Sequence, residues 1–354
     1  MTLLPKGFAG RVVRWQQSHG RHGLPWQQTR DPYRVWLSEV MLQQTQVTTV
    51  LEYYARFLER FPDVAALAAA DLDAVFALWS GLGYYSRARN LHRCAQEIVA
   101  LHGGEFPRSA QVLQTLPGIG RSTAAAIASF CFGERTAILD GNVKRVLARV
   151  LAFDADLASA PNEKLLWSHA QALVPARRHD MPSYTQGLMD IGATVCLARN
   201  PSCLVCPLQA ACAAARQGQP ERYPVKTRKL KRSAQSLWLL QAKSRAGQVW
   251  LEKRPASGIW AGLYCLPVFD SRDALRAAVS SPQRARLEDS GPFVHVLTHK
   301  DLHLHPVEGI FAKEPLHGSP GAWFAQDEWP ALGLPAPIRR MLEEATARPV
   351  RGGA

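Results

Sequence analysis

Four cysteines in one short stretch are the side chains of this sequence best suited to bind a metal. Cys196, Cys203, Cys206 and Cys212 fall within seventeen residues and follow the spacing C-x6-C-x2-C-x5-C. Four thiolates from one segment can hold a metal centre, and the spacing lacks the two separated C-x2-C knuckles of a zinc ribbon. Ligand type alone leaves an iron–sulfur cluster and zinc both open. The alternative without a metal is a set of buried free thiols or a disulfide knot.

Glu39 is the first of two carboxylates that could take part in catalysis. It lies in the segment WLSEVMLQQTQV, residues 36–47, among tryptophan, valine and methionine. On a continuous helix, Glu39, Gln43 and Gln46 share one stripe. The apolar neighbours should desolvate the carboxyl group and raise its pKa, so that Glu39 stays protonated near neutral pH and acts as a general acid. The plainer alternative is a surface row of Glu and Gln on an amphipathic helix.

Asp140 is the second carboxylate, in the segment LDGNVKRV at residues 139–146. An apolar pair, an Asp and a Gly precede an amphipathic helix whose inward residues are Val143, Val146 and Leu147. This pattern predicts Asp140 as the N-terminal cap of that helix. A capping carboxylate should keep a low pKa and stay ionised, and it could then stabilise a developing cation. A cap with no other role is the alternative.

The segment LPGIGRSTA, residues 116–124, is typical of a helix–hairpin–helix motif. Glycine at Gly118 and Gly120 lets backbone N–H groups approach a phosphate without obstruction by a Cβ atom. A helix that begins at about Arg121 would point its positive end at the same phosphate. Such contacts hold the DNA backbone without reading sequence. An ordinary tight turn between helices is the alternative.

The elements that must position these groups divide the chain into two parts. Residues 1–215 have the apolar periodicity of helices, with one helix opening at Asp31 and continuing through Val47. Asp71 and Ser109 are expected to open two more. After Ser233 the pattern changes to strands at residues 236–241, 248–252 and 293–298 and helices at 273–279 and 336–346, which together predict an α+β domain.

The composition fits a multidomain globular protein that binds a polyanion. The chain has 354 residues, 47% of them hydrophobic and 20% charged, with a net charge of +13. A basic balance favours phosphate contacts. No apolar run is long enough to span a membrane, and the N-terminus has no signal core. We therefore expect a cytoplasmic, bacterial-type protein that is associated with the nucleoid through DNA, without a membrane partner.

These segments and the cysteine loop together resemble the helix–hairpin–helix superfamily of base-excision DNA glycosylases, in the iron–sulfur branch that includes endonuclease III. Within it, SEVMLQQTQV at residues 38–47 and LDGNVKRV look like the adenine DNA glycosylase (MutY type) family. The resemblance implies a [4Fe–4S] cluster on the four cysteines. It implies domains at 1–220, with the hairpin at about 109–131 and the cluster loop at 196–212. A basic linker follows at 221–233, then a Nudix-like domain at 234–348 that recognises 8-oxoguanine.

The resemblance also implies a reaction. The substrate would be double-stranded DNA that carries adenine opposite 8-oxoguanine or guanine, and the enzyme, expected to be a monomer, must flip the adenine out to reach its glycosidic bond. Glu39 would protonate adenine N7, Asp140 would stabilise the oxocarbenium ion, and Asn142 would orient the catalytic groups. Other DNA- or substrate-binding positions carried over from the family are Gln44, Tyr84, Lys144 and Gln186.

Ser122 distinguishes the expected adenine glycosylase from the enzyme that is the nearest alternative, an endonuclease III-like glycosylase-lyase. In lyase members of the superfamily a lysine at this place is the Schiff-base nucleophile, whereas this chain reads Gly120-Arg121-Ser122. We therefore expect a mainly monofunctional glycosylase. The alternatives are an endonuclease III-like glycosylase-lyase and a non-enzymatic DNA-binding protein with a metal cluster.

The C-terminal part resembles a Nudix domain at SGIWAGLY, residues 257–264. The next segment, DSRDALR at 270–276, lacks the R-E-x-x-E-E run that binds Mg²⁺ in Nudix hydrolases, so no metal chemistry is expected. Relatives often read the lesion with Phe-Ser-His, where this chain has Leu297, Thr298 and His299. The Thr hydroxyl and the His ring keep hydrogen-bonding ability, but the aromatic ring is missing.

Overall fold

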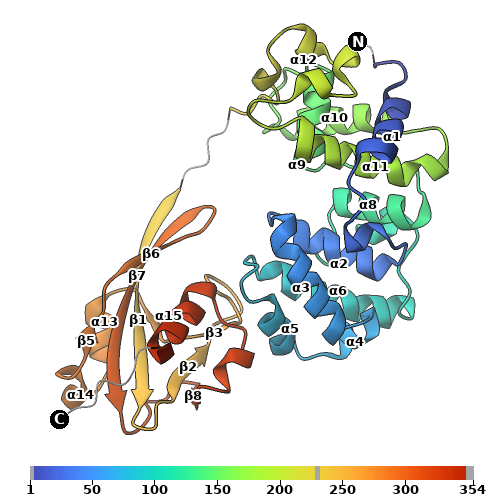
Figure 1. The fold of residues 1–354 in the computed structure, drawn as a ribbon. Helices are drawn as coiled ribbons and strands as arrows, with labels where there is room; N and C mark the ends of the chain where they lie inside the picture. Colours follow the sequence, from blue (N-terminus) through green and yellow to red (C-terminus); the bar gives the residue numbers. More distant parts are fainter. Residues whose placement is uncertain (1–3, 228–231, 348–354) are drawn as a thin grey trace. The chain divides into compact units, whose positions relative to one another are not determined.

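The computed structural model describes residues 4–227 and 232–347, and it confirms the predicted fold class. The chain divides into two compact units, one made of Met1–Ala68 and Arg93–Lys229 and the other of Ala69–His92 and Leu230–Ala354. Helices make up the N-terminal part, and an α+β domain follows residue 232 (Figure 1). Within the described ranges, none of the helices has the length and apolar character that crossing a membrane requires.

The helices before residue 228 alternate with short turns. Their bounds are Phe8–His19 (α1), Pro32–Leu42 (α2), Val47–Arg60 (α3), Val64–Ala69 (α4), Leu72–Trp79 (α5), Ser86–His102 (α6), Ala110–Leu113 (α7), Arg121–Phe132 (α8), Gly141–Val150 (α9), Ala160–Ala172 (α10), Met181–Asp190 (α11) and Ala213–Arg216 (α12).

Predicted helix starts are confirmed where a polar side chain caps the helix. The carboxylate of Asp31 accepts a hydrogen bond from Tyr33 N at 2.9 Å, and the hydroxyl of Ser109 accepts one from Gln111 N at 3.2 Å. Helix α5 begins directly after Asp71. The side chains of Asp31 and Ser109 satisfy amide groups that a helix start otherwise leaves without an acceptor.

The predicted continuous helix from Asp31 to Val47 is wrong. Helix α2 ends at Leu42, and α3 begins at Val47. Between them Gln44 adopts a left-handed conformation with φ of 57°, which interrupts the helical hydrogen bonds. The expected stripe of Glu39, Gln43 and Gln46 therefore does not form.

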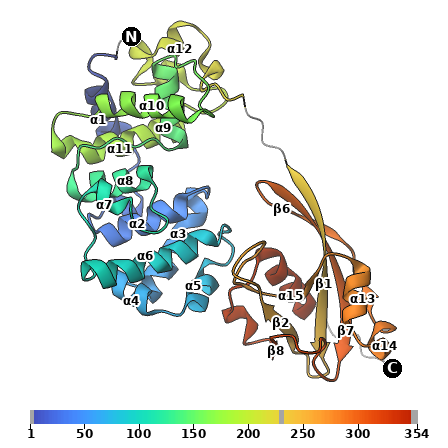
Figure 2. The same cartoon turned by 180° about the vertical axis from the view of Figure 1, so that it is seen from behind.

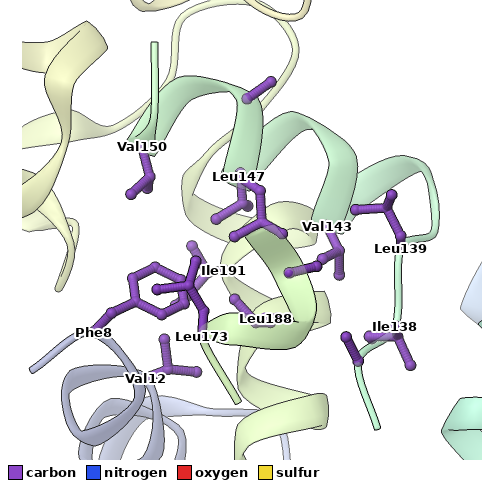
Figure 3. Packing of buried hydrophobic residues seen from close by; sticks show 14 of the residues in the cluster. Phe8, Val12, Ile138, Leu139, Val143, Leu147, Val150, Leu173, Leu188 and Ile191 are labelled. Carbon is purple, nitrogen blue, oxygen red and sulfur yellow. The ribbon is translucent and has the colours of Figure 1, made fainter. Parts of the chain in front are cut away.

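Helix α9 lies at the centre of a core cluster in the first unit. Its inward residues Val143, Val146 and Leu147 are fully or almost fully buried, as predicted. Figure 3 shows this side of α9 directed at Leu188 and Ile191 of the neighbouring helical segment. The segment around Gly192 approaches α9 closely because this residue has no side chain. A Cβ atom on Gly192 would lie only 2.6 Å from the Cβ atom of Asn142.

The C-terminal domain is built around one sheet. Its order is β3-β2-β1-β7-β5, with β4 paired to β1, β6 to β7 and β8 to β2. The long strands β1 and β7 run parallel, and the other pairs are antiparallel. The strand bounds are Ser233–Ser244 (β1), Val249–Lys253 (β2), Tyr264–Cys265 (β3), Val268–Phe269 (β4), Glu288–Asp289 (β5), Phe293–Val296 (β6), Lys300–Phe311 (β7) and Gly321–Phe324 (β8).

Each face of this sheet has its own hydrophobic layer. Leu237 and Leu239 of β1 point to the layer that includes Leu342 of helix α15 (Ala336–Ala347). Leu240 belongs to a second layer with Leu275 of helix α13 (Arg272–Ala278), and Figure 2 shows α13 and α15 on opposite sides of strand β1. The three predicted strands correspond to β1, β2 and β6, and the two predicted helices correspond to α13 and α15. The short helix α14 (Ser281–Arg284) was not predicted.

The first part of the expected linker packs on the helical unit. Tyr223 is buried, its carbonyl oxygen accepts a hydrogen bond from Arg149 Nε at 3.1 Å, and Leu157 N donates to the Val225 carbonyl. The expected basic linker is therefore not a solvated spacer at its start, because Tyr223 carries a large apolar ring that the core of the first unit buries. Residues 228–231 of the expected linker lie outside the described residues.

Candidate active site and DNA-binding elements

Glu39 and Gln186 line one cavity of about 340 Å³ in the first unit. Helix α2 contributes Glu39 and helix α11 contributes Gln186, while α1, the turn around Trp26, Val47 of α3 and Phe130 of α8 contribute to the other walls. The fold thus brings together two predicted site residues that lie far apart in the sequence. The volume is at the small end of the range of ligand sites.

The environment of Glu39 raises its pKa to about 8. Burial among protein atoms is the largest cause, and the negative charge of Asp140 is the second. The side chain remains partly accessible because it faces the cavity. The prediction of a desolvated, protonated carboxyl group is therefore confirmed, and at neutral pH Glu39 can donate a proton to a molecule bound in the cavity.

Asp140 caps helix α9, as predicted, and its Oδ1 accepts a hydrogen bond from Val143 N at 2.8 Å. The expectation of a low pKa is wrong. Burial raises the pKa of Asp140, and the hydrogen bonds from the Val143 and Asn142 amides, with the charge of Arg145, oppose the rise only in part. Of the two carboxyl groups, however, only Asp140 receives backbone hydrogen bonds and a nearby cation that favour its ionised form.

The side chain of Arg145 holds the first turn of α9 in place. Arg145 Nη2 donates to Asn142 Oδ1 at 2.8 Å and to the Gly192 carbonyl at 2.6 Å, and its Nε donates to the Cys196 carbonyl at 2.7 Å. Asn142 therefore makes its contact with Arg145 one turn further along the helix. This contact fixes the amide side chain beside Asp140.

Ser122 and Lys144 both have protein partners. Ser122 Oγ accepts a hydrogen bond from Leu139 N at 3.1 Å and so anchors the residue before Asp140. Lys144 forms an ion pair with Glu163 at 2.5 Å. To contact DNA as predicted, Lys144 would have to leave its ion pair with Glu163.

Sequence reasoning missed a buried ion pair beside Gln186. Asp190 is fully buried and accepts hydrogen bonds from Arg21 N at 3.0 Å and Arg21 Nε at 2.7 Å. Gln186 Nε2 donates to the same Asp190 at 2.8 Å. The three groups form a chain that orients the Gln186 amide at the cavity. Arg21 and Asp190 are separated by 169 residues, and no local pattern marks the pair.

The helix–hairpin–helix segment forms as predicted, with Gly118 in its turn and Gly120 capping α8. Gly118 has φ of 75°, a conformation that favours glycine. Gly120 has φ of −77°, which any residue can adopt, and a Cβ atom there would meet no described atom within 4 Å. Neither backbone strain nor packing requires a glycine at position 120, although glycine suits its place as the cap of α8, and the open space beside it leaves room for an external group.

Gln44 and Tyr84 lie in two exposed turns with left-handed backbone. Gln44 joins α2 to α3, and Tyr84, with φ of 47° and an exposed fraction of 42%, joins α5 to α6. Arg87 supports the second turn, because its guanidinium group donates to the Leu82 carbonyl at 2.9 Å and lies 5.6 Å from the Tyr84 ring centre. Gln44 is therefore open to a partner, whereas the Tyr84 hydroxyl group contacts the hydroxyl group of Thr298, another predicted site residue.

All four predicted metal ligands line one small cavity between helix α9 and the loop that follows residue 196. They are free thiols, which rules out a disulfide knot in this structure. Arg149 Nη1 donates to Cys196 Sγ at 3.3 Å. In the described part of the chain, no group of three or more metal-ligating side chains is arranged to hold a metal ion. The observation that supports a bound group is that the four cysteines line the same cavity.

Thr298 and His299 form the exposed tip of the β6–β7 hairpin. Leu297 N donates to the Lys300 carbonyl at 2.8 Å and closes this two-residue turn. Both residues are exposed, and the Thr298 hydroxyl group contacts that of Tyr84.

Two family models match the chain. Residues 37–175 match the HhH-GPD superfamily of base excision DNA repair proteins, and residues 237–344 match the NUDIX domain. Among solved structures, a thermostable thymine-DNA glycosylase is 27% identical, with a TM-score of 0.52 over 60% of this chain and 96% of that chain.

Several curated proteins similar to this chain are named adenine DNA glycosylase. The adenine DNA glycosylase of Buchnera aphidicola subsp. Baizongia pistaciae is 35% identical over 342 residues, which is 95% of each chain. The adenine DNA glycosylase of Homo sapiens is 45% identical over 225 residues, which is 61% of this chain and 40% of that protein. The similarity to the Buchnera protein spans both matched domains.

The pKa of Glu39 provides a direct test of the site. We expect a pKa near 8 in the wild type and a lower value in Asp140→Asn, because the substitution removes the second-largest cause of the shift. Carbon-13 NMR of the labelled carboxyl groups, with Glu39→Gln to assign the signal, measures both values. A Glu39 pKa near 4.5 in the wild type would contradict the site as described.

Gly120→Ala tests the hairpin as a phosphate-binding element. Because its φ is −77° and the space around it is open, we expect the free energy of unfolding to fall by no more than about 1 kcal/mol, the scale for replacing a favourable helix cap by alanine. We expect duplex DNA affinity to fall about tenfold, as for the loss of one charge-assisted hydrogen bond. Gly118→Ala is the control, and its φ of 75° should make it less stable by about 1–2 kcal/mol. Fluorescence anisotropy and thermal unfolding measure the two effects; unaltered DNA affinity in Gly120→Ala would count against the phosphate contact.

Proposed function

This chain belongs to the adenine DNA glycosylase family, and we propose that it removes adenine paired with 8-oxoguanine or guanine in double-stranded DNA. The enzyme works in base-excision repair, by hydrolysis of the N-glycosidic bond. The similarity of the whole chain to named adenine DNA glycosylases supports the substrate, and the chemistry below rests on the residues of this chain.

In this proposal Glu39 donates a proton to the leaving base and Asp140 stabilises the cation that forms on the sugar. The adenine swings out of the duplex into the cavity, where the Glu39 carboxyl group donates its proton to N7 as the C1′–N9 bond breaks. Adenine then leaves as a neutral base. The sugar develops an oxocarbenium cation, which the carboxylate of Asp140 stabilises or captures before water completes hydrolysis.

The observation that carries this assignment is the contrast between the two carboxyl groups. The pKa of Glu39 is raised to about 8 by burial and by the charge of Asp140. Asp140 instead accepts backbone hydrogen bonds at the start of α9. A pair whose surroundings favour one protonated and one ionised member is the arrangement that a proton donor and an electrostatic stabiliser require.

Around these groups, Asn142 and Ser122 act as positioning residues. Arg145 holds Asn142, and Ser122 holds the backbone before Asp140. We propose that Gln186, oriented by Asp190, contacts the adenine edge, since an amide can pair with adenine N6 and N7. Gln44 and Tyr84, displayed on exposed turns, are proposed to enter the duplex around the estranged purine.

We propose that the four cysteines hold a [4Fe–4S] cluster. The donor set fits, because four thiols line one cavity and Arg149 offers a cationic hydrogen bond to Cys196. The cluster would serve to hold the loop against α9 and to support DNA binding. The C-terminal domain is proposed to recognise 8-oxoguanine through Thr298 and His299 at the exposed hairpin tip.

Single-turnover kinetics of two conservative variants test the proposal. Glu39→Gln and Asp140→Asn should each lower the rate of adenine release by at least about a hundredfold, as expected for loss of acid catalysis or charge stabilisation. Binding to the mispaired duplex should remain. Duplexes with adenine opposite 8-oxoguanine, guanine, thymine and cytosine measure the pair preference, and the first two should react fastest.

The same assays separate the alternatives. Efficient borohydride trapping of wild-type protein on abasic DNA would favour an endonuclease III-like lyase, since Ser122 offers no amine. Tight duplex binding without adenine release by the wild-type protein would favour a non-enzymatic DNA-binding protein. Full activity of Glu39→Gln would refute its role as the acid.

A further inference from the structure

The carboxylate of Asp190 is fully buried behind the cavity that Glu39 and Gln186 line, here called the adenine cavity. Its Oδ1 accepts hydrogen bonds from Arg21 Nε at 2.7 Å and from Gln186 Nε2 at 2.8 Å, and its Oδ2 accepts one from Arg21 N at 3.0 Å. Arg21 and Gln186 line the adenine cavity, whereas Asp190 does not. One buried anion therefore holds two of the polar side chains that a base in the cavity would meet.

The chemistry of Asp190 decides which way the Gln186 amide is turned. An amide has one donor nitrogen and one acceptor oxygen, and a half-turn about the last side-chain bond exchanges them. Because a carboxylate only accepts hydrogen bonds, the nitrogen must face Asp190. The opposite orientation would set the Gln186 oxygen against an acceptor in a buried position. The carbonyl oxygen Oε1 is therefore directed away from Asp190 and remains for a group in the adenine cavity.

Arg21 and Glu39 add donors to the same cavity. Arg21 uses its Nε for Asp190, and a guanidinium group has no acceptor atom, so the rest of this group offers only N–H donors. Glu39 holds a proton at neutral pH and adds an O–H donor. Among these three side chains, Gln186 supplies the acceptor, and the other two supply donors.

This arrangement matches a purine that carries an amino group at C6. In adenine the N6 amino group donates, and the ring nitrogens N3 and N7 accept. In a 6-oxopurine such as hypoxanthine, O6 is an acceptor, so the Gln186 oxygen would face a second acceptor. Polar groups that a binding site leaves unpaired away from water discriminate strongly against the wrong ligand. Hypoxanthine has nearly the size and shape of adenine, so this polarity is the feature that can tell them apart.

We propose that Asp190 is a positioning residue that makes the adenine cavity reject 6-oxopurines, because it holds the Gln186 amide with its oxygen toward the base. The inference rests on the proposed release of adenine and extends it to the bases that the enzyme refuses. Asp190 acts through Gln186 and Arg21 and contacts no base itself.

Single-turnover release from duplexes that carry adenine, hypoxanthine or unsubstituted purine opposite 8-oxoguanine tests the proposal. The wild-type protein should release hypoxanthine at least about a hundredfold more slowly than adenine. Asp190→Asn gives Gln186 a neighbour that can donate as well as accept, so the amide can turn over. The adenine-to-hypoxanthine rate ratio should then fall at least about tenfold. Unsubstituted purine has neither donor nor acceptor at C6, and its rate reports general damage to the site.

Asp180→Asn is the matched control, a change from carboxylate to amide at the start of the same helix. Asp180 accepts a hydrogen bond from Arg177 Nε at 2.9 Å and is not among the residues that line the adenine cavity. This variant should keep the wild-type rate ratio. Thermal unfolding shows whether each variant is folded.

A second variant keeps the test decisive if Asp190→Asn folds poorly. Gln186→Met leaves the buried pair of Asp190 and Arg21 in place and removes only the amide. Adenine then loses an acceptor and hypoxanthine loses an opposing one, so the adenine-to-hypoxanthine rate ratio should again fall about tenfold.

Release of hypoxanthine by the wild-type protein as fast as adenine would overturn the proposal. An unchanged rate ratio in folded Asp190→Asn or in Gln186→Met would also overturn it, since an equal loss on every base marks a purely structural residue. Failure of the proposed function gives a different result, in which the wild-type protein binds the duplexes and releases none of the bases. Titration with free adenine and free hypoxanthine then measures the preference of the cavity, and equal affinity refutes the role of Asp190.

Discussion

The electrostatic coupling of Glu39 to Asp140 is the constraint on which the catalytic account depends. A desolvated carboxyl group needs a reason to retain its proton near neutral pH, and here burial and a neighbouring negative charge supply it together. Asp140 can be that neighbour because the first turn of α9 presents amide groups to it. The protonation state of one carboxyl group thus depends on where a helix begins.

The position of this helix start is set by contacts from several segments. Ser122 binds the backbone before Asp140, Arg145 ties Asn142 to Gly192 and to the carbonyl of Cys196, and Gly192 permits the close approach. Cys196, the first of the four cysteines, is therefore linked to helix α9 through two arginines, Arg145 and Arg149.

Local chemistry made much of the architecture predictable, and long-range contacts account for what was missed. Caps at Asp31, Ser109 and Asp140 and the alternation of β1 could be read from the sequence, because each depends on residues a few positions apart. The break at Gln44 could not, since the left-handed turn occurs at a glutamine, whereas a glycine is the residue that usually marks such a turn in a sequence. The pair of Arg21 with Asp190 depends on residues distant in the chain, and it appears only when the fold is assembled.

The dependence of the single-turnover rate of adenine release on pH tests the central claim most directly. If Glu39 must donate a proton with a pKa of about 8, the rate stays constant through neutral pH and falls as the pH rises through about 8, where Glu39 loses its proton. On the acid side, the rate should fall as Asp140 becomes protonated, at a pH above its ordinary pKa of 3.8. A rate that already declines between pH 5 and 6 as alkali is added would show that no sheltered proton donor operates, and would contradict the account.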